Sequence, residues 1–243
     1  MVSVKEHYDN LLAEHYTWMF GDHTAKVLEN REFFQRANIT PRRGGKALDL
    51  GCGSGFQSIA LAELGFEVLG IDLCETLLEE LRGRSAGLDI NVVQGDMLDY
   101  RMYEDRGPYE IAVCMGDTLT HLQKAKSVST LLENVYRNLE NQGILALTFR
   151  DFTTELKGVE RIIPVRTDED KLMATFLEYE ESYVNVHDMI FLKSDSGWKL
   201  QTSVYRKLRI GLDQVRNFLA KTGFEIISSE VWEGFSSIIA QKV

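Results

Sequence analysis

Three glycines spaced two residues apart are the residues in this sequence best suited to chemistry. Gly51, Gly53 and Gly55 lie in ALDLGCGSGF, directly after an apolar run and directly before a helical pattern. Glycines at such a junction let the backbone approach a ligand without a Cβ in the way, and they present N–H groups at the positive end of the helix. An ordinary left-handed turn needs one or two glycines. The spacing therefore predicts a loop that holds a ligand.

The residues after the loop indicate which ligand it holds. The dinucleotide fingerprint GxGxxG would place its third glycine where this chain has Phe56. The next apolar run ends at Asp72, 17 residues after Gly55, and an acid there can accept hydrogen bonds from both ribose hydroxyls of an adenosine group. The following run ends in Asp96 and Met97, which could accept from the adenine amine and cover the base. One such acid is more often a loop or cap residue, but two at successive strand ends support each other.

The elements that position these residues alternate between short apolar runs and helical patterns. The predicted strands are 46–50, 66–72, 89–95, 109–115 and 143–149. The helical patterns between them lie at 57–64, 75–82 and 127–139, with an irregular stretch at 100–107. Strands joined by crossover helices form right-handed βαβ units, so we expect a parallel sheet that helices cover on both faces.

Further segments surround this alternating region. Two helices are predicted ahead of residue 38, with a break at Gly21 and Asp22. Strand-like alternation from about 161 to 210, with a turn at 194–197, predicts an inserted antiparallel sheet. The last connection is too short for a crossover helix, so the final strands must form a hairpin. The elements at this end are a helix over 212–221 that stops at Gly223, and strands 224–232 and 236–243 joined around Gly234.

A family resemblance covers about residues 46–150 and the terminal hairpin. The chain resembles the class I S-adenosylmethionine (SAM)-dependent methyltransferases in DLGCGSG, GID, QGDM, YEIAVCMGDTLTHL and NQGILALTF. The family's glycine motif, an acid followed by x-G-x-G-x-G, matches at Asp49, Gly51, Gly53 and Gly55. Its ribose-binding acid matches Asp72, and its adenine-side acid matches Asp96. The cofactor-binding set that the resemblance implies also includes Cys52, Leu73, Met97, Met115 and Gly116.

The resemblance also implies an architecture. It is an α/β, Rossmann-like fold with N-terminal helices, and its mostly parallel sheet of seven strands has the order 3-2-1-4-5-7-6, with only the seventh strand antiparallel. In this family, the segments before the first strand and after the fifth often form a lid, and the plan looks similar to glycine and sarcosine N-methyltransferases. The expected division is an N-terminal helical cap (1–45), a SAM-binding core (46–150 and 211–243) and an inserted antiparallel β subdomain that serves as lid (151–210).

Four residues are candidates for the acceptor side of the site. Ligands of open α/β sheets bind beyond the carboxyl ends of the strands, where Asp117 and His121 could act as base or orienter. Alternatively, Asp117 holds its loop together and His121 starts the next helix. Arg150 could clamp a substrate carboxylate, or pair with Asp151 or another local acid. Tyr16, on the first predicted helix, could line a lid or staple that helix to the sheet.

The implied reaction is methyl transfer from SAM to a small molecule by in-line displacement, with S-adenosylhomocysteine (SAH) as product and no metal. Catalysis would rest on positioning the acceptor and excluding water. Two alternatives stay open. One is a non-catalytic SAM-binding module, and the other is an NAD-dependent oxidoreductase, which Phe56 disfavours. The motifs do not identify the acceptor atom.

Composition narrows the partners. The 27 Lys and Arg face 37 Asp and Glu, a formal net charge of −10, which disfavours nucleic acid as a partner. No apolar run is long enough to span a bilayer, and the start lacks the apolar core of a signal peptide, so we expect a cytoplasmic protein. The 3 cysteines have no metal-ligand spacing and are expected to be reduced thiols. The edges of the inserted sheet could pair across a homodimer axis.

Overall fold

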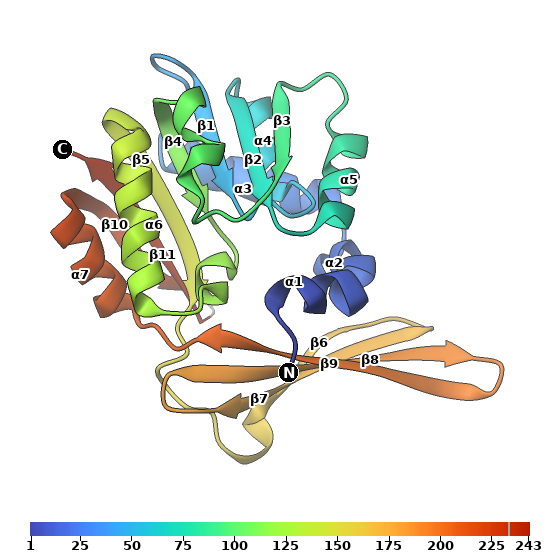
Figure 1. Ribbon diagram of the computed structural model, residues 1–243. Helices are drawn as coiled ribbons and strands as arrows, with labels where there is room; N and C mark the ends of the chain where they lie inside the picture. Colours follow the sequence, from blue (N-terminus) through green and yellow to red (C-terminus); the bar gives the residue numbers. More distant parts are fainter. Residues whose placement is uncertain (233) are drawn as a thin grey trace.

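Two β-sheets and a set of helices make up the structure, a computed structural model that describes residues 1–232 and 234–243. Figure 1 shows a large sheet with helices on both sides, a smaller sheet beneath it, and the N-terminal helices between the two. No helix among these residues is long and apolar enough to cross a membrane. The predicted turn around Gly234 includes residue 233, which lies outside the described residues.

The large sheet has seven strands in the order β10-β11-β5-β4-β1-β2-β3. Their bounds are β1 Lys46–Leu50, β2 Glu67–Asp72, β3 Ile90–Gln94, β4 Tyr109–Cys114, β5 Leu139–Arg150, β10 Phe224–Trp232 and β11 Phe235–Lys242. Strand β11 runs antiparallel to both β5 and β10, while the other neighbouring pairs are parallel. The predicted α/β fold and the strand order 3-2-1-4-5-7-6 are therefore confirmed.

Helices pack on both faces of this sheet. The bounds are α3 His23–Arg36, α4 Phe56–Glu63, α5 Glu75–Arg84, α6 Ala125–Asn138 and α7 Leu212–Thr222. Apolar residues of α6 recur at Val128, Leu131, Leu132 and Val135, the spacing of one helical face, and all four are buried against the sheet. Helix α7 packs on the same face, while α3, α4 and α5 pack on the other.

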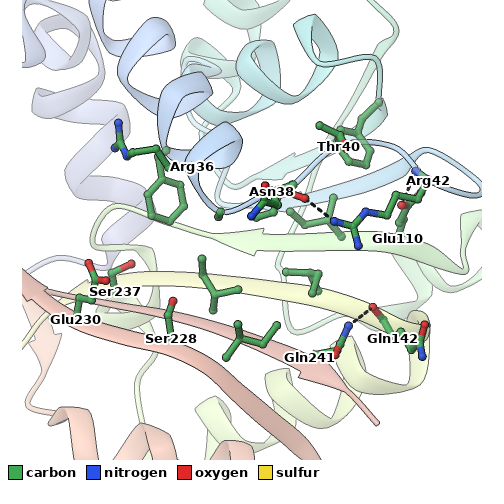
Figure 2. A pocket seen from close by; sticks show the side chains of 18 residues that line it. Arg36, Asn38, Thr40, Arg42, Glu110, Gln142, Ser228, Glu230, Ser237 and Gln241 are labelled. Atoms are coloured by element: carbon green, nitrogen blue, oxygen red, sulfur yellow. Dashed lines mark hydrogen bonds between the residues drawn. The ribbon is translucent and has the colours of Figure 1, made fainter.

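The terminal hairpin has less helical cover on one of its faces than the parallel strands have. A groove of about 580 Å³ lies between α3 and the strands β5, β10 and β11, and Figure 2 shows the side chains that line it. Ile227 of β10 lies at this groove with 56% of its surface exposed. Covering helices therefore protect the parallel strands better than the terminal hairpin.

The N-terminal segment fills the space between the two sheets. It runs as α1 Val4–His7, a π-helical turn η1 Tyr8–Leu12 and α2 Ala13–Phe20. The predicted break follows, where Gly21 has φ 90° and the Asp22 side chain accepts a hydrogen bond from the N–H of Ala25. The segment buries Leu11 and Leu12 against the small sheet, and Ala13 against α5.

The inserted sheet is antiparallel, as predicted, with strand order β6-β7-β8-β9. Its strands are β6 Ile162–Thr167, β7 Lys171–Tyr179, β8 Tyr183–Ser194 and β9 Gly197–Leu208. The predicted turn at 194–197 connects β8 to β9. One face carries Met173, Leu177, Val186 and Ile190, which are buried beneath the N-terminal segment and the large sheet.

Candidate functional site

The glycine loop has the backbone conformation that the sequence predicts. Gly51, Gly53 and Gly55 have φ values of 78°, 51° and 95°, a region that side chains with a Cβ rarely adopt. A Cβ on Gly51 would lie 2.2 Å from Cγ2 of Thr118, and a Cβ on Gly55 would lie 2.2 Å from Cδ1 of Leu81. The first and third glycines are therefore needed for packing as well as for conformation.

Asp72 is held in place by the loop beside it. Its Oδ2 accepts a hydrogen bond from the N–H of Gly53 at 2.9 Å, and its Oδ1 accepts one from Cys74 at 2.9 Å. Burial raises the pKa of Asp72, and these two N–H donors oppose that rise. The carboxylate that ends β2 is thus oriented before any ligand binds.

A cavity of about 300 Å³, which we call the loop cavity, opens at the carboxyl ends of β1, β2 and β3. Six predicted cofactor-binding residues line it: Gly51, Gly53, Asp72, Leu73, Asp96 and Met97. Four others, Asp49, Cys52, Gly55 and Met115, are buried behind its wall, and Gly116 lines a neighbouring cavity. The N-terminal segment closes the loop cavity with Tyr8 and Tyr16.

Asp49 is buried and makes its hydrogen bond within the protein. It is 1% exposed, and its Oδ2 accepts a hydrogen bond from the hydroxyl of Ser58 at 2.6 Å. Burial raises the pKa of Asp49 to about 7, although the Ser58 hydrogen bond lowers it. In this structure the first acid of the glycine motif ties β1 to α4.

A second cavity, of about 260 Å³, lies between the large sheet, the N-terminal segment and the inserted sheet. We call it the inner cavity. All four acceptor-side candidates line it: Tyr16, Asp117, His121 and Arg150. Tyr8, Tyr16, Thr118 and His121 line both cavities, so the two cavities meet at these side chains.

Asp117 is shared by two cations. Its carboxylate accepts hydrogen bonds from Nζ of Lys207 and from the backbone N–H of Arg150, and its Oδ2 lies 3.7 Å from Nε of Arg150. Burial would raise the pKa of Asp117, but Lys207 and Arg150 lower it overall. Asp117 therefore fixes its loop and also faces the inner cavity, where its lowered pKa makes it a weak base and favours the orienting role.

Arg150 pairs with Asp117 and not with Asp151. The oxygens of Asp151 accept hydrogen bonds from Thr153 and from the N–H of Leu212 instead. The guanidinium of Arg150 stacks 4.3 Å from the ring centroid of Phe235. Its terminal nitrogens make no hydrogen bond to the part of the chain that the structure describes. One carboxylate thus faces two cations at this end of the inner cavity.

His121 lies at the junction of the two cavities. It ends a 3₁₀ turn, η4 Thr118–His121, and helix α6 begins four residues later at Ala125, so the alternative that His121 starts the helix is wrong. Its Nε2 lies 3.4 Å from the hydroxyl of Tyr8. Burial and the nearby Lys207 lower the pKa of His121 to about 3, so the imidazole is neutral at physiological pH.

A buried polar cluster links the N-terminal segment to the inserted sheet. Nε2 of His7 lies 3.0 Å from Oδ2 of Asp188, whose Oδ1 accepts a hydrogen bond from the hydroxyl of Thr175 at 2.6 Å. His7 is fully buried, and its ring stacks on Tyr205 at a centroid distance of 4.0 Å. Asp188, Thr175 and Tyr205 all line the inner cavity.

Sequence reasoning missed this cluster, and Lys207 with it. The missed groups lie outside the glycine motif and its strand ends, on the N-terminal helix or on strands of the insert. One signal was available, since Asp188 falls on the buried face of an alternating strand, where an acid is unexpected. Its partner His7 lies 181 residues away, so spacing could not pair the two.

Comparison with known proteins identifies the family. The sequence pattern of the methyltransferase domain family matches residues 47–143. YqeM of Bacillus subtilis, named as a candidate methyltransferase, is 30% identical over 190 residues, which cover 75% of this chain and 74% of that protein. The chain belongs to the SAM-dependent methyltransferase family.

Other methyltransferases share the sequence or the fold. A glycine/sarcosine N-methyltransferase of Parasynechococcus marenigrum is 29% identical over 164 residues, and the match spans 64% of this chain but only 57% of that relative. The solved structure of the CcbJ methyltransferase from Streptomyces caelestis superposes with a TM-score of 0.80 at 16% identity, over 98% of this chain and 99% of that one. The SAM-bound amino pentose methyltransferase CalS10 of Micromonospora echinaspora gives 0.76 at 17% identity, over 95% and 96%. At these identities the two structures support the methyltransferase fold alone.

The groove in Figure 2 is larger than either cavity of the site, but none of the predicted site residues of this methyltransferase lines it. It runs over a face of the large sheet, whereas the loop cavity lies at the carboxyl ends of its strands. Ligands of open α/β sheets bind at those ends. The two smaller cavities are therefore the candidate active site.

Proposed function

We propose that this methyltransferase transfers a methyl group from SAM, held in the loop cavity, to a small molecule held in the inner cavity. The observation that carries the proposal is the junction at Tyr8, Tyr16, Thr118 and His121, where the two cavities meet. A donor and an acceptor bound on either side would be in contact there. Holding two reactants in one geometry is the main way such a transfer can be accelerated.

The residues of the loop cavity fit an adenosine-containing cofactor. Asp72 and Asp96 supply carboxylate acceptors for hydroxyl and amine donors, and Leu73 and Met97 supply apolar surface for a base. Glycine at position 53 leaves the cavity wall without a side chain there. SAM, when bound, supplies an electrophilic methyl group for in-line displacement by the acceptor.

The inner cavity suits an acceptor with an anionic group. Arg150 and Lys207 outnumber Asp117 at one end, and the terminal nitrogens of Arg150 can bind a carboxylate in bidentate fashion. One relative is named for glycine and sarcosine, and one solved structure of similar fold is named for an amino pentose; all three compounds carry an amine. We therefore propose an acceptor that combines an amine with an anionic group.

The neutral residues at the junction orient the acceptor. His121 has a pKa of about 3 and is too weak a base to remove a proton from an ammonium group at neutral pH. It can instead accept a hydrogen bond from an amine N–H and direct the lone pair. Burial raises the pKa values of Tyr8 and Tyr16, so both hydroxyls stay protonated and available as donors. The N-terminal segment and the inserted sheet would act as the lid that excludes water.

Calorimetric titration with SAH, with NAD in parallel, tests the cofactor. Binding of SAH alone is the expected result, and binding of NAD alone would favour an oxidoreductase. A second assay measures SAH production with glycine, sarcosine and an amino sugar as acceptors. Tight SAH binding without turnover of a broad acceptor panel would favour the non-catalytic module.

The proposed contact between Arg150 and an acceptor carboxylate is tested in the same assay with Arg150→Lys and Arg150→Gln. If Arg150 binds an acceptor carboxylate in bidentate fashion, both variants should raise KM for a carboxylate-bearing acceptor by about tenfold or more and leave SAH affinity unchanged. An unchanged KM in a folded Arg150→Gln variant would remove Arg150 from the acceptor site.

A further inference from the structure

Asp188 is a buried carboxylate in the wall of the inner cavity. It is 3% exposed and lies on β8, and apolar side chains such as Ile163 and Val186 line the same cavity. A carboxylate in such surroundings normally has a cationic partner, because an unpaired charge is costly away from water. Within the described part of the chain, its one ion-pair contact at 4.0 Å or less is with His7.

His7 does not neutralise this carboxylate. Its Nε2 lies 3.0 Å from Oδ2 of Asp188, while its Nδ1 is buried and has no hydrogen-bond partner among the described residues. A charged imidazole carries a hydrogen on both ring nitrogens, so Nδ1 would be a buried donor without an acceptor. The hydrogen therefore belongs on Nε2, which donates to Asp188 from a neutral ring. The negative charge of Asp188 is left without a cation.

The carboxylate also has room for another donor. Its Oδ1 accepts a hydrogen bond from the hydroxyl of Thr175 at 2.6 Å, and its Oδ2 accepts the one from His7. Each carboxylate oxygen can accept two hydrogen bonds. Because Asp188 and Thr175 both line the inner cavity, a cationic donor in that cavity would complete the pairing that the chain itself leaves unmade.

The inner cavity carries opposite charges in two places. Asp117, Arg150 and Lys207 form one group, in which one carboxylate faces two cations, a net charge of +1. Lys207 pairs with Val184, four residues before Asp188 on β8, so the two rows of the sheet lie roughly 13 Å apart. The row between them holds Leu177, Val186 and Tyr205. The cavity thus has a cationic part and an anionic part with an apolar and aromatic stretch of sheet between them.

We propose that Asp188 binds a positively charged group of the acceptor that is not the group methylated. The inference rests on the proposed function, which places the acceptor's anionic group at Arg150 and its reacting amine at the junction of the two cavities. An ammonium group has no lone pair with which to attack a methyl group, so the nitrogen that reacts is a different one. The acceptor class is therefore a diamino acid, with a carboxylate, a nucleophilic amine and a further ammonium group.

Calorimetric titration with matched pairs of probes tests the inference. Ornithine and norvaline share the carboxylate, the α-amine and the chain length, but only ornithine ends in an ammonium group. The pair 2,4-diaminobutyrate and 2-aminobutyrate differs in the same way with a shorter chain. The wild type should bind at least one diamino acid about tenfold or more tightly than its partner, the usual strength of a hydrogen bond to a charged group.

Asp188→Asn should abolish this preference and leave SAH affinity unchanged. The amide has the shape of the carboxylate and can still form hydrogen bonds with Thr175 and His7, and circular dichroism checks the fold. A merely structural role would weaken both members of a pair equally, whereas loss of the charged contact weakens the diamino acid alone. Glu178→Gln is the matched control, because it removes a carboxylate that is 54% exposed on β7 of the same sheet. This variant should keep the preference.

Three results would each overturn the inference. They are a wild type without the preference, whether or not Asp188→Asn folds, an Asp188→Asn protein that keeps it, and a Glu178→Gln protein that loses it. The probes are titrated with and without SAH. Absent SAH binding or absent turnover, which would count against the proposed function, is therefore recorded separately from an absent preference.

Discussion

The two cavities of the site are built in different ways. The loop cavity is formed chiefly by consecutive strand ends and the loops after them, between Gly51 and Leu98. The inner cavity is assembled from segments far apart in the chain, and its main polar contacts join Asp117 to Lys207 and Asp188 to His7. A local motif can therefore specify the first cavity, while the second depends on how three separate segments pack.

The largest expected effect is on stability, through the buried contact between His7 and Asp188 beside the inner cavity. Asp188→Ala should lower the free energy of unfolding by about 3 kcal/mol or more, because it leaves His7 and the Thr175 hydroxyl buried without a partner. Chemical denaturation measures this change. A double-mutant cycle with His7→Ala should show a coupling of more than about 1 kcal/mol if the two residues act as one contact.

Asp170→Ala is the control for this comparison. Asp170 lies in the loop before β7 of the same sheet and pairs with Lys193 at 3.5 Å, but its side chain is 80% exposed. Its removal should change stability by less than about 0.5 kcal/mol. If the two substitutions lower the free energy of unfolding equally, the contact between His7 and Asp188 contributes no more than an ordinary surface ion pair.

Substitutions in the loop cavity should change the affinity for SAH. Asp72→Ala should weaken SAH binding by roughly 1–3 kcal/mol, because it removes a carboxylate acceptor and the hydrogen bonds that order Gly53 and Cys74. Calorimetry measures the affinity, and circular dichroism checks the fold. Asp99→Ala removes a nearby acid that pairs with Arg101, and it should bind SAH as the wild type does. Unchanged affinity in a folded Asp72→Ala protein would refute the ribose assignment.

These differences explain which parts of the fold and of the site could be predicted from the sequence. The strands, the strand order and the loop cavity follow from hydrophobic periodicity, glycine spacing and a family motif, all of which are local in the chain. Asp117 and Arg150 were placed at the right sheet edge because strand ends share an edge, but their partner Lys207 lies on β9. The contact between His7 and Asp188 requires two segments whose relative position only tertiary packing decides.

The last prediction concerns Asp49, which the family motif places with the cofactor and the structure places behind the loop. Its pKa of about 7 in the folded chain is well above the ordinary value of 3.8. Between pH 4 and 7 the folded state therefore holds a proton that the unfolded state has released, so this group's contribution to stability falls as the pH rises. Asp49→Asn removes the titration and keeps an oxygen that can accept from Ser58.

The unfolding free energy of Asp49→Asn should thus rise relative to the wild type by about 1 kcal/mol per pH unit between pH 5 and 7. Chemical denaturation of both proteins across that range measures the difference in unfolding free energy. The contributions of the titrating groups that both proteins share cancel in this difference. Ser58→Ala should shift the window to higher pH, because the carboxylate loses its donor. A difference that does not change with pH, or a loss of SAH affinity as large as in Asp72→Ala, would contradict the structural role and favour a cofactor-binding role for Asp49.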